Sequence, residues 1–203
     1  MDPVTIIFSI AILIFSVIAH ELAHGYAAEA FGDHTARYAG RLTWNPIAHI
    51  DPVGSILVPI VTSFAGITFG WARPVPYDPN NLRGGAKAEA AVAGAGAFVN
   101  LSIALVFGLI IRFFAGSLPA SFVEITSAIV VINIMLAVFN LIPIPPLDGS
   151  KVILAFFPLQ ARRLGHQLES WGLIAVLIFV YFFWYLFSPI IEVIFRFFTG
   201  LGF

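Results

Sequence analysis

The chain contains no cysteine and few charged residues. The first absence excludes certain chemical sites, and the second narrows the class of protein. Without cysteine, its 203 residues form no disulfide, no thiolate zinc site and no cysteine nucleophile. Charged residues make up 10% of the chain, whereas a soluble domain carries about 25%. The net charge of -1 and the lack of any basic block argue against nucleic acid as a partner. With 60% hydrophobic residues, the composition predicts an integral protein of the lipid bilayer.

The stretch His20-Glu21-Leu22-Ala23-His24 is an H-E-x-x-H motif inside an apolar segment. Two histidines four residues apart share one face of a helix, so both imidazoles can reach one metal ion. Glu21 can contact a water molecule at that metal, and soluble enzymes with this arrangement hydrolyse peptide bonds using zinc. Because polar residues are costly in a membrane helix, the motif predicts hydrolysis within the membrane.

Apolar runs define the candidate membrane helices. The first extends from about Pro3 to Phe31, and Ala88–Ile111 and Phe122–Leu141 are two further clear spans. Each is long enough, because roughly 20 apolar residues cross a bilayer. Near the C-terminus, Trp171–Phe187 is apolar, and Ile190–Phe198 is short enough to span only partly or to lie in the interface.

The part between the first two spans is less regular. Around Ala39–Trp44, short extended pieces predict a β-ribbon or a loop. The apolar segment Val53–Phe69 is interrupted by glycine and proline, so it either spans the bilayer or re-enters from the side that it leaves. We expect one all-α polytopic membrane domain over residues 1–203. It has a three-helix core in residues 3–150, with a re-entrant or β-ribbon segment, and additional C-terminal helices in residues 151–203.

A catalytic zinc needs three protein ligands and one open position, and the motif supplies two. The third is His, Asp or Glu, because the chain lacks cysteine. Asp148 is the strongest carboxylate candidate, since it follows a hydrophobic span in a proline-broken segment at the membrane edge. The other histidines fit loop stabilisation or solvation better: His34, His49 and His166.

Whether Asp148 can meet the motif depends on the Val53–Phe69 segment. If this segment re-enters, Asp148 emerges on the membrane face that holds His24, and if it spans, Asp148 emerges on the opposite face. The metal-site hypothesis therefore requires the re-entrant alternative. Most lysines and arginines then share the active-site face while Arg112 lies opposite, which predicts a cytoplasmic active site. The lack of a secretory or organellar address fits a prokaryotic inner membrane.

Together these motifs resemble the site-2 protease family of intramembrane zinc metalloproteases, over nearly the full chain. The H-E-x-x-H motif and the segment Asn140–Gly149 are the most specific matches, and the loop Gly40–Pro52 and the segment Gly70–Pro76 also fit. One position departs from the family pattern, because Ala97 stands where proline is usual. This difference concerns the local bend of the middle core helix and not metal ligation.

The resemblance implies one zinc ion per chain and a three-helix catalytic core with ligands on its first and third helices. The implied ligands are His20, His24 and Asp148, with Glu21 as the general base. It also implies that Asn140 lies close to the site, and the retained Asn100 is a candidate to line it. Either asparagine could steady the oxyanion.

We expect a compact member without a PDZ domain that cuts a single-span membrane protein near its cytoplasmic end, in regulated intramembrane proteolysis. The substrate must be locally unwound, because a helical peptide bond hides its carbonyl. It could bind as an added strand along a short stretch of the loop: Gly40, Arg41, Leu42 and Thr43.

Two other functions fit part of the pattern. A metal transporter would need further ligands along a path across the bilayer, and the other spans offer almost none. A non-catalytic scaffold of the same fold would have no need of the intact set His20, Glu21, His24 and Asp148.

Overall fold

The computed structural model describes residues 3–63, 70–157, 172, 176 and 184–202. Within them every regular element is a helix: α1 (Pro3–Ala30), α2 (Thr35–Tyr38), η1 (Pro46–His49), η2 (Pro52–Leu57), α3 (Val58–Ser63), η3 (Pro79–Asn81), α4 (Ala86–Phe114), η4 (Ala115–Ser117), α5 (Ala120–Asn140), α6 (Asp148–Leu154), η5 (Trp184–Leu186) and α8 (Ser188–Thr199). The all-helical prediction is therefore confirmed for the described residues. Most of the expected helix Trp171–Phe187 lies outside them.

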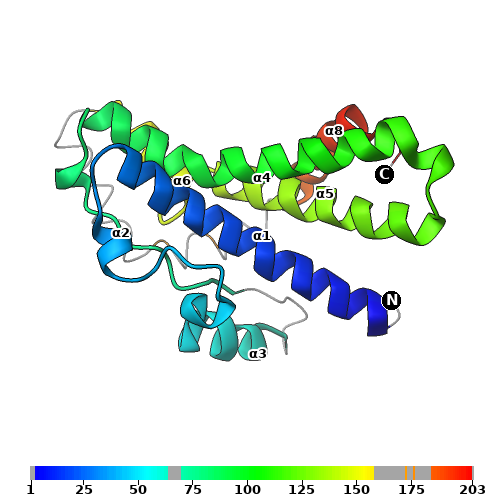
Figure 1. Cartoon of the computed structure of the whole chain (residues 1–203), viewed down its shortest axis with the longest axis horizontal. Helices are drawn as coiled ribbons and strands as arrows, with labels where there is room; N and C mark the ends of the chain where they lie inside the picture. The colour runs from blue at the N-terminus through cyan, green and yellow to red at the C-terminus, as the bar shows by residue number, and fades with distance from the viewer. Residues whose placement is uncertain (1–2, 64–69, 158–171, 173–175, 177–183, 203) are drawn as a thin grey trace.

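Three helices are long and apolar enough to cross a membrane by length and composition: Thr5–Ala30, Ala86–Ser117 and Ala120–Asn140. They confirm the three predicted spans. In Figure 1, α4 and α5 lie side by side along the long axis, and α1 crosses them at an angle. Large apolar side chains such as Ile7 and Phe113 are exposed on their outer surfaces, as lipid contact requires. The chain is an integral membrane protein.

α4 packs between its neighbours through small side chains. Ala88, Ala93, Gly96 and Ala97 are buried on it, and such residues let membrane helices approach closely. Ala97, which occupies the position of the family proline, lies inside a continuous helix. Further along, a hydrophobic core joins α4, α5 and α8: Ala104, Ile111, Val130, Ile134, Ile191 and Phe195.

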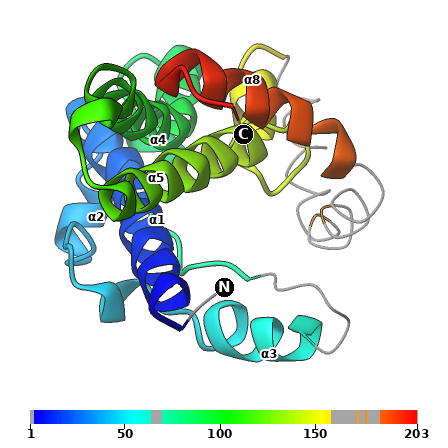
Figure 2. The ribbon, with the colours of Figure 1, turned by 90° about the vertical axis from the view of Figure 1, so that its right-hand side faces the viewer.

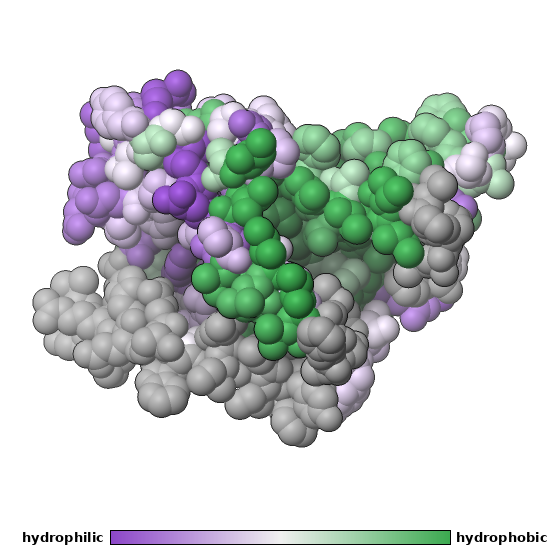
Figure 3. All heavy atoms as spheres, turned by 90° about the horizontal axis from the view of Figure 1, so that it is seen from below, coloured by the Kyte–Doolittle hydropathy of each residue, from purple (hydrophilic) through white to green (hydrophobic). Residues whose placement is uncertain are grey.

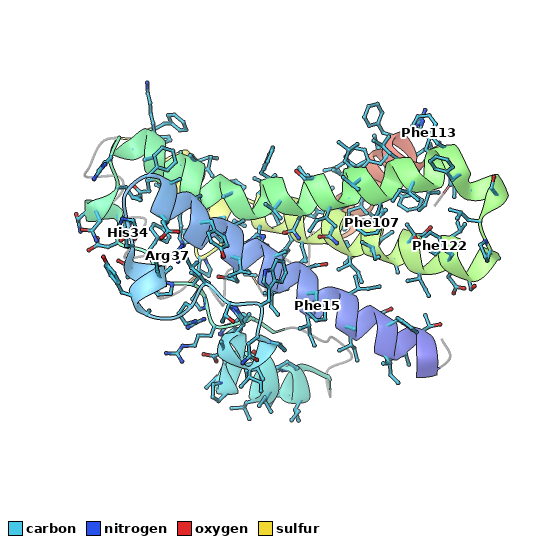
Figure 4. All side chains as sticks on the ribbon, in the orientation of Figure 1. Phe15, His34, Arg37, Phe107, Phe113 and Phe122 are labelled. Carbon is cyan, nitrogen blue, oxygen red and sulfur yellow. The ribbon has the colours of Figure 1, made fainter. Side chains whose placement is uncertain are left out.

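Polar residues gather at the end of the molecule that holds α2, whereas apolar ones cover much of the remaining surface in view (Figure 3). At this end, α2 is held to α1 by Glu29, which accepts hydrogen bonds from Arg37 and pairs with His34 at 3.3 Å. Figure 4 shows His34 and Arg37 far from Phe113 and Phe122, which lie at the opposite end.

Asp33, which follows α1, ties the polar end together. It is 1% exposed and accepts hydrogen bonds from three residues: Thr35, Asp78 and Asn81. The backbone N–H of Arg83 also donates to the carbonyl of Phe31 at 2.8 Å. The segment after the second apolar stretch therefore lies against the end of α1.

The region around Ala39–Trp44 consists of turns and loop, so the β-ribbon alternative is not found there. Its polar groups bond locally: the N–H of Arg41 donates to Ala36, and the carbonyl of Thr43 pairs with His49 Nε2 at 2.9 Å. Since these bonds engage the backbone, the stretch is held as a loop without a strand partner among the described residues.

The apolar stretch that begins at Pro52 forms η2, a π-helix, and then α3. Trp71, beyond this stretch, returns to its start: the N–H of Trp71 donates to the carbonyl of Gly54 at 3.0 Å. The hydroxyl of Ser55 also donates to the carbonyl of Trp71 at 2.9 Å. In Figures 1 and 2, α3 lies apart from α4 and α5.

Candidate metal centre

His20 and His24 lie on one face of α1, as their four-residue spacing predicts. They are 5% and 7% exposed, and their rings stand edge to face with centroids 4.7 Å apart. A neutral imidazole buried in a membrane helix needs a partner for both nitrogens. The two rings satisfy this need in the same way: Nδ1 of each lies against an oxygen atom of α4, and Nε2 of each lies against Asp148.

Asp148 is brought to these histidines from 128 residues away by the break between α5 and α6. Prolines follow α5 and stop its continuation, and α6 then begins at Asp148. Gly149 permits this approach, because a Cβ there would overlap the backbone carbonyl of Leu141. The Asp-Gly pair therefore places a carboxylate against the end of α5.

The three side chains fit a zinc ion. Asp148 Oδ2 lies 3.0 Å from His20 Nε2 and 3.1 Å from His24 Nε2, and the candidate ligand atoms all lie within 4.8 Å of one another. Ligands at zinc–nitrogen and zinc–oxygen distances near 2.1 Å, in tetrahedral geometry, are roughly 3.3 Å apart. Two nitrogens and one carboxylate oxygen also match the donors of catalytic zinc, which leaves its fourth position open.

The remaining histidine nitrogens are held by carbonyl oxygens. His20 Nδ1 lies 2.6 Å from Asn100 Oδ1, and His24 Nδ1 lies 2.7 Å from the carbonyl of Val92. A carbonyl oxygen only accepts hydrogen bonds, so each Nδ1 donates and each Nε2 keeps its lone pair for a metal. Gly96 completes the seat of His20, because a Cβ there would lie 2.5 Å from the imidazole.

Glu21 points to a different part of the structure than the histidines do. Its Oε2 accepts a hydrogen bond from the backbone N–H of Val75 at 2.8 Å, so the segment after Trp71 is attached beside the metal centre. Val75 is buried, and Gly25 makes room for it together with Leu42. The Glu21 carboxylate is thus held one residue from a metal-facing histidine by a segment distant in sequence.

Asp148 is only 13% exposed, yet its charge is favoured. Burial would raise the pKa of this carboxyl, but its pairing with His20 and His24, whose Nε2 groups donate to it when they are protonated, outweighs burial and holds the pKa well below its usual range. An ionised carboxylate is the form that binds a metal.

Comparison with known proteins identifies the family of this chain. The model of "Peptidase family M50" matches residues 108–183. The chain is 39% identical over 173 residues to "Putative zinc metalloprotease YwhC" of Bacillus subtilis (strain 168), covering 82% of this chain and 76% of that protein. The chain belongs to peptidase family M50. The M50 assignment confirms the resemblance to site-2 proteases, and zinc is the metal that the three ligands suit.

Further relatives carry the same description, "Putative zinc metalloprotease", under the name Rip2. The chain is 28% identical over 173 residues to Rip2 of Mycolicibacterium smegmatis (strain ATCC 700084 / mc(2)155), covering 85% of this chain and 66% of that protein. It is 26% identical over 164 residues to Rip2 of Mycobacterium tuberculosis (strain ATCC 25618 / H37Rv), covering 80% of this chain and 62% of that one. The chain thus spans about two thirds of the length of these Rip2 proteins. No solved structure matches it significantly.

The other site residues that the sequence predicts have different surroundings, and of those described next one contacts a candidate ligand. Asn100 is fully buried and contacts His20, whereas Asn140 donates to the carbonyl of Leu136 one turn earlier on α5. In the loop, Arg41 donates to the carbonyl of Arg73 at 2.8 Å. Gly40 is exposed with a positive φ of 66°.

Arg41 lies within electrostatic reach of the candidate base. Burial and the neighbouring Arg73 lower the pKa of Arg41, and the charge of Glu21 opposes this shift. The Nε of Arg41 is buried and has no hydrogen-bond partner among the described residues.

Asn133 is a residue that the sequence analysis did not select. It is fully buried on α5 and accepts a hydrogen bond from Asn100 Nδ2 at 2.7 Å. Its own amide nitrogen donates to Ser16 Oγ on α1, at 2.9 Å. The available signal was an amide inside an apolar span, since such a residue is costly in a bilayer.

Proposed function

We propose that this chain is an intramembrane endopeptidase of the site-2 protease type, which hydrolyses a peptide bond of a membrane protein in regulated intramembrane proteolysis. One observation carries the proposal: His20, His24 and Asp148 converge inside the helical bundle with a carboxylate, Glu21, beside them. M50 membership supports a membrane zinc protease. The site's position within apolar helices favours a substrate that is itself in the bilayer.

The proposed reaction uses Glu21 as a general base. Bound zinc supplies Lewis-acid activation of water and polarisation of the scissile carbonyl. The Glu21 carboxylate takes a proton from the attacking water and passes it to the leaving amine nitrogen. The N–H of Val75 orients this carboxylate and stabilises its charge, because a hydrogen bond to an ionised acceptor is strong.

The proposed substrate is a single-span membrane protein, unwound at the cut. Arg41 and Leu42 lie on the loop that adjoins Gly25 and Val75, next to Glu21, so an extended peptide along Gly40–Thr43 would pass the base. Arg41→Gln should raise KM while zinc content stays at the parent level. An unchanged KM would remove Arg41 from the substrate site.

A re-entrant segment is proposed for Val53–Phe69. The hydrogen bonds that join Gly54 to Trp71, and Asp33 to Asp78, support it, since they hold both flanks of the segment on one side. Because the chain lacks cysteine, single cysteines report topology cleanly.

Exposed positions on either side of the segment, Tyr38→Cys and Asn80→Cys, should be labelled by an impermeant thiol reagent from the same membrane face. Ser117→Cys, beyond α4, should be labelled from the other face. Labelling of the first two from opposite faces would establish a spanning segment instead.

The metal centre is proposed to face the cytoplasm of a prokaryotic inner membrane. Basic residues lie at its end of the molecule: Arg37, Arg41, Arg73, Arg83, Lys87 and Lys151. At the far end of α4, Arg112 donates to the carbonyl of Phe197 on α8, near Arg196. This distribution supports a cytoplasmic metal centre under the positive-inside rule.

The decisive experiment compares the parent with Glu21→Gln after purification in detergent. Zinc is measured by elemental analysis, and cleavage is followed on a tagged single-span reporter. Gln lacks the basic oxygen but has nearly the same shape, so about one zinc per chain should remain while cleavage is lost. Glu29→Gln, the same change two turns later on α1, should bind zinc and cleave like the parent.

Equal cleavage by Glu21→Gln and the parent would refute Glu21 as the base. Zinc in the parent with no cleavage of any reporter would favour the scaffold alternative. A parent that binds no zinc would refute the metal centre, and zinc movement across vesicles would favour a transporter.

A further inference from the structure

A buried polar network crosses all three core helices at the depth of the metal centre. It joins Ser16 on α1, Asn100 on α4 and Asn133 on α5, with exposures of 6%, 0% and 0%. Buried amides in a bilayer are costly unless every group is paired, so this network requires an explanation. Helix association alone would be satisfied by amides anywhere along the helices, whereas this network ends on His20.

The direction of each hydrogen bond follows from the backbone carbonyls that anchor the two amides. Asn133 Nδ2 lies 2.9 Å from the carbonyl of Ile129, which can only accept, so the nitrogen faces that way. Asn133 Oδ1 therefore faces Asn100 Nδ2, at 2.7 Å. Asn100 Nδ2 also lies 3.3 Å from the carbonyl of Ser16, which can only accept, so the nitrogen of this second amide faces Ser16 and Asn133.

The order of these bonds has a consequence for His20. Asn100 Oδ1 is the only part of that amide left to face the ring, at 2.6 Å from Nδ1, and an amide oxygen cannot donate. The proton of neutral His20 then resides on Nδ1, and Nε2 keeps a lone pair directed toward Asp148. A reversed Asn100 amide would present N–H groups to Nδ1 and favour the other tautomer, whose Nε2 could not bind a metal.

We propose that Asn133 is a positioning residue of the metal centre, which acts through Asn100 to hold His20 in the tautomer and orientation that bind zinc. This inference rests on the proposed zinc site and extends it to a helix, α5, whose own side chains do not ligate the metal. It also links α5, which leads into the Asp148 segment, to the histidine on α1. Ser16 is the hydroxyl acceptor that completes the pairing of Asn133.

The test measures the zinc dissociation constant by competition with a chromophoric chelator, using the full chain in detergent. Asn133→Ala removes the acceptor for Asn100, and zinc binding should weaken about tenfold, the lower end of what outer-shell partners contribute. Asn133→Asp is the conservative variant. A buried carboxyl stays protonated and still offers its carbonyl oxygen to Asn100 Nδ2, so this variant should bind zinc like the parent. Thr126→Val, a buried polar change two turns earlier on α5, is the matched control and should also bind like the parent.

A second readout needs no substitution. In the zinc-loaded parent, the Nδ1–H of His20 should exchange with solvent far more slowly than the ring proton of exposed His34. Equal exchange at the two histidines would overturn the proposal, even if Asn133→Ala failed to fold. Zinc affinity that is unchanged in Asn133→Ala would overturn it as well and leave Asn133 a helix contact only. A parent without zinc would overturn the proposed function itself, which separates the two failures.

Discussion

The substitution Gly96→Ala tests the geometry of the metal centre directly. A Cβ at Gly96 would lie 2.5 Å from both Cε1 and Nε2 of His20 and 2.6 Å from its Nδ1. Ordinary contacts begin near 3.4 Å, so the imidazole would have to move by roughly 1 Å. The ring cannot move freely, because Asn100 and Asp148 hold its two nitrogens.

A shift of that size exceeds what a zinc site tolerates, since ligand distances in metal sites stay within about 0.2 Å of ideal. We expect zinc affinity to fall by about 100-fold or more. Cleavage should fall with it, because a 1 Å misplacement alone costs about 100-fold in rate. Folding should not suffer from helix propensity, as alanine is about 1 kcal/mol better than glycine in a helix interior. The loss is therefore specific to the metal centre.

The assay is zinc affinity by chelator competition, together with cleavage of a single-span reporter and thermal unfolding in detergent. Gly94→Ala is the matched control, because it changes the same residue type on the same helix with its Cβ 4.0 Å from Val152. It should leave zinc affinity and cleavage at the parent level. If Gly96→Ala binds zinc and cleaves as the parent does, His20 is not seated against α4 and the ligand geometry is refuted.

Three further predictions follow from the same structure. Gly149→Ala should reduce zinc content, because its Cβ would overlap the carbonyl of Leu141 and displace Asp148. Full zinc content in this variant would contradict the role given to the Asp-Gly pair. Asp33→Asn should lower the free energy of unfolding at neutral pH by about 1–3 kcal/mol, and the melting temperature with it, because it removes acceptor capacity from a buried cluster. Burial alone would raise the pKa of Asp33, but the hydrogen bonds that it accepts hold the pKa below its usual range. Its stabilisation is therefore present above about pH 4 and lost as the pH falls further, so parent and variant should converge in acid and a constant difference would contradict this. Zinc removal by a chelator should lower the melting temperature of the parent and leave that of His24→Ala unchanged, since only a zinc-binding native state gains from the ion.

Much of the fold could be predicted from local sequence. Continuous apolar runs are sufficient to define α1, α4 and α5, because a bilayer demands that backbone groups pair within each span. Near Ala39–Trp44 the sequence left a β-ribbon and a loop open, and the structure has the loop, for a similar physical reason. Its residues suit an extended chain, but a strand needs a neighbour, and here nearby side chains and turns occupy the backbone groups instead.

The candidate site was partly visible in the sequence and partly hidden. The spacing of His20 and His24 places two ligands on one helix face without any tertiary information. Asp148 could be proposed from its cost at a membrane edge, but its approach to His20 depends on the packing of Gly149 against α5. Asn133 was missed because a single amide in an apolar helix says nothing about its partners.

The sequence alone thus determined a membrane-embedded helical chain with an H-E-x-x-H motif, since hydrophobicity and helical spacing are local properties. Only the tertiary structure decided which carbonyl faces each histidine and which N–H holds Glu21. Those contacts join residues 54 to 128 positions apart, and their geometry follows from how closely α1, α4 and α5 pack. A metal centre requires placement to within a few tenths of an ångström, and the packed bundle supplies it.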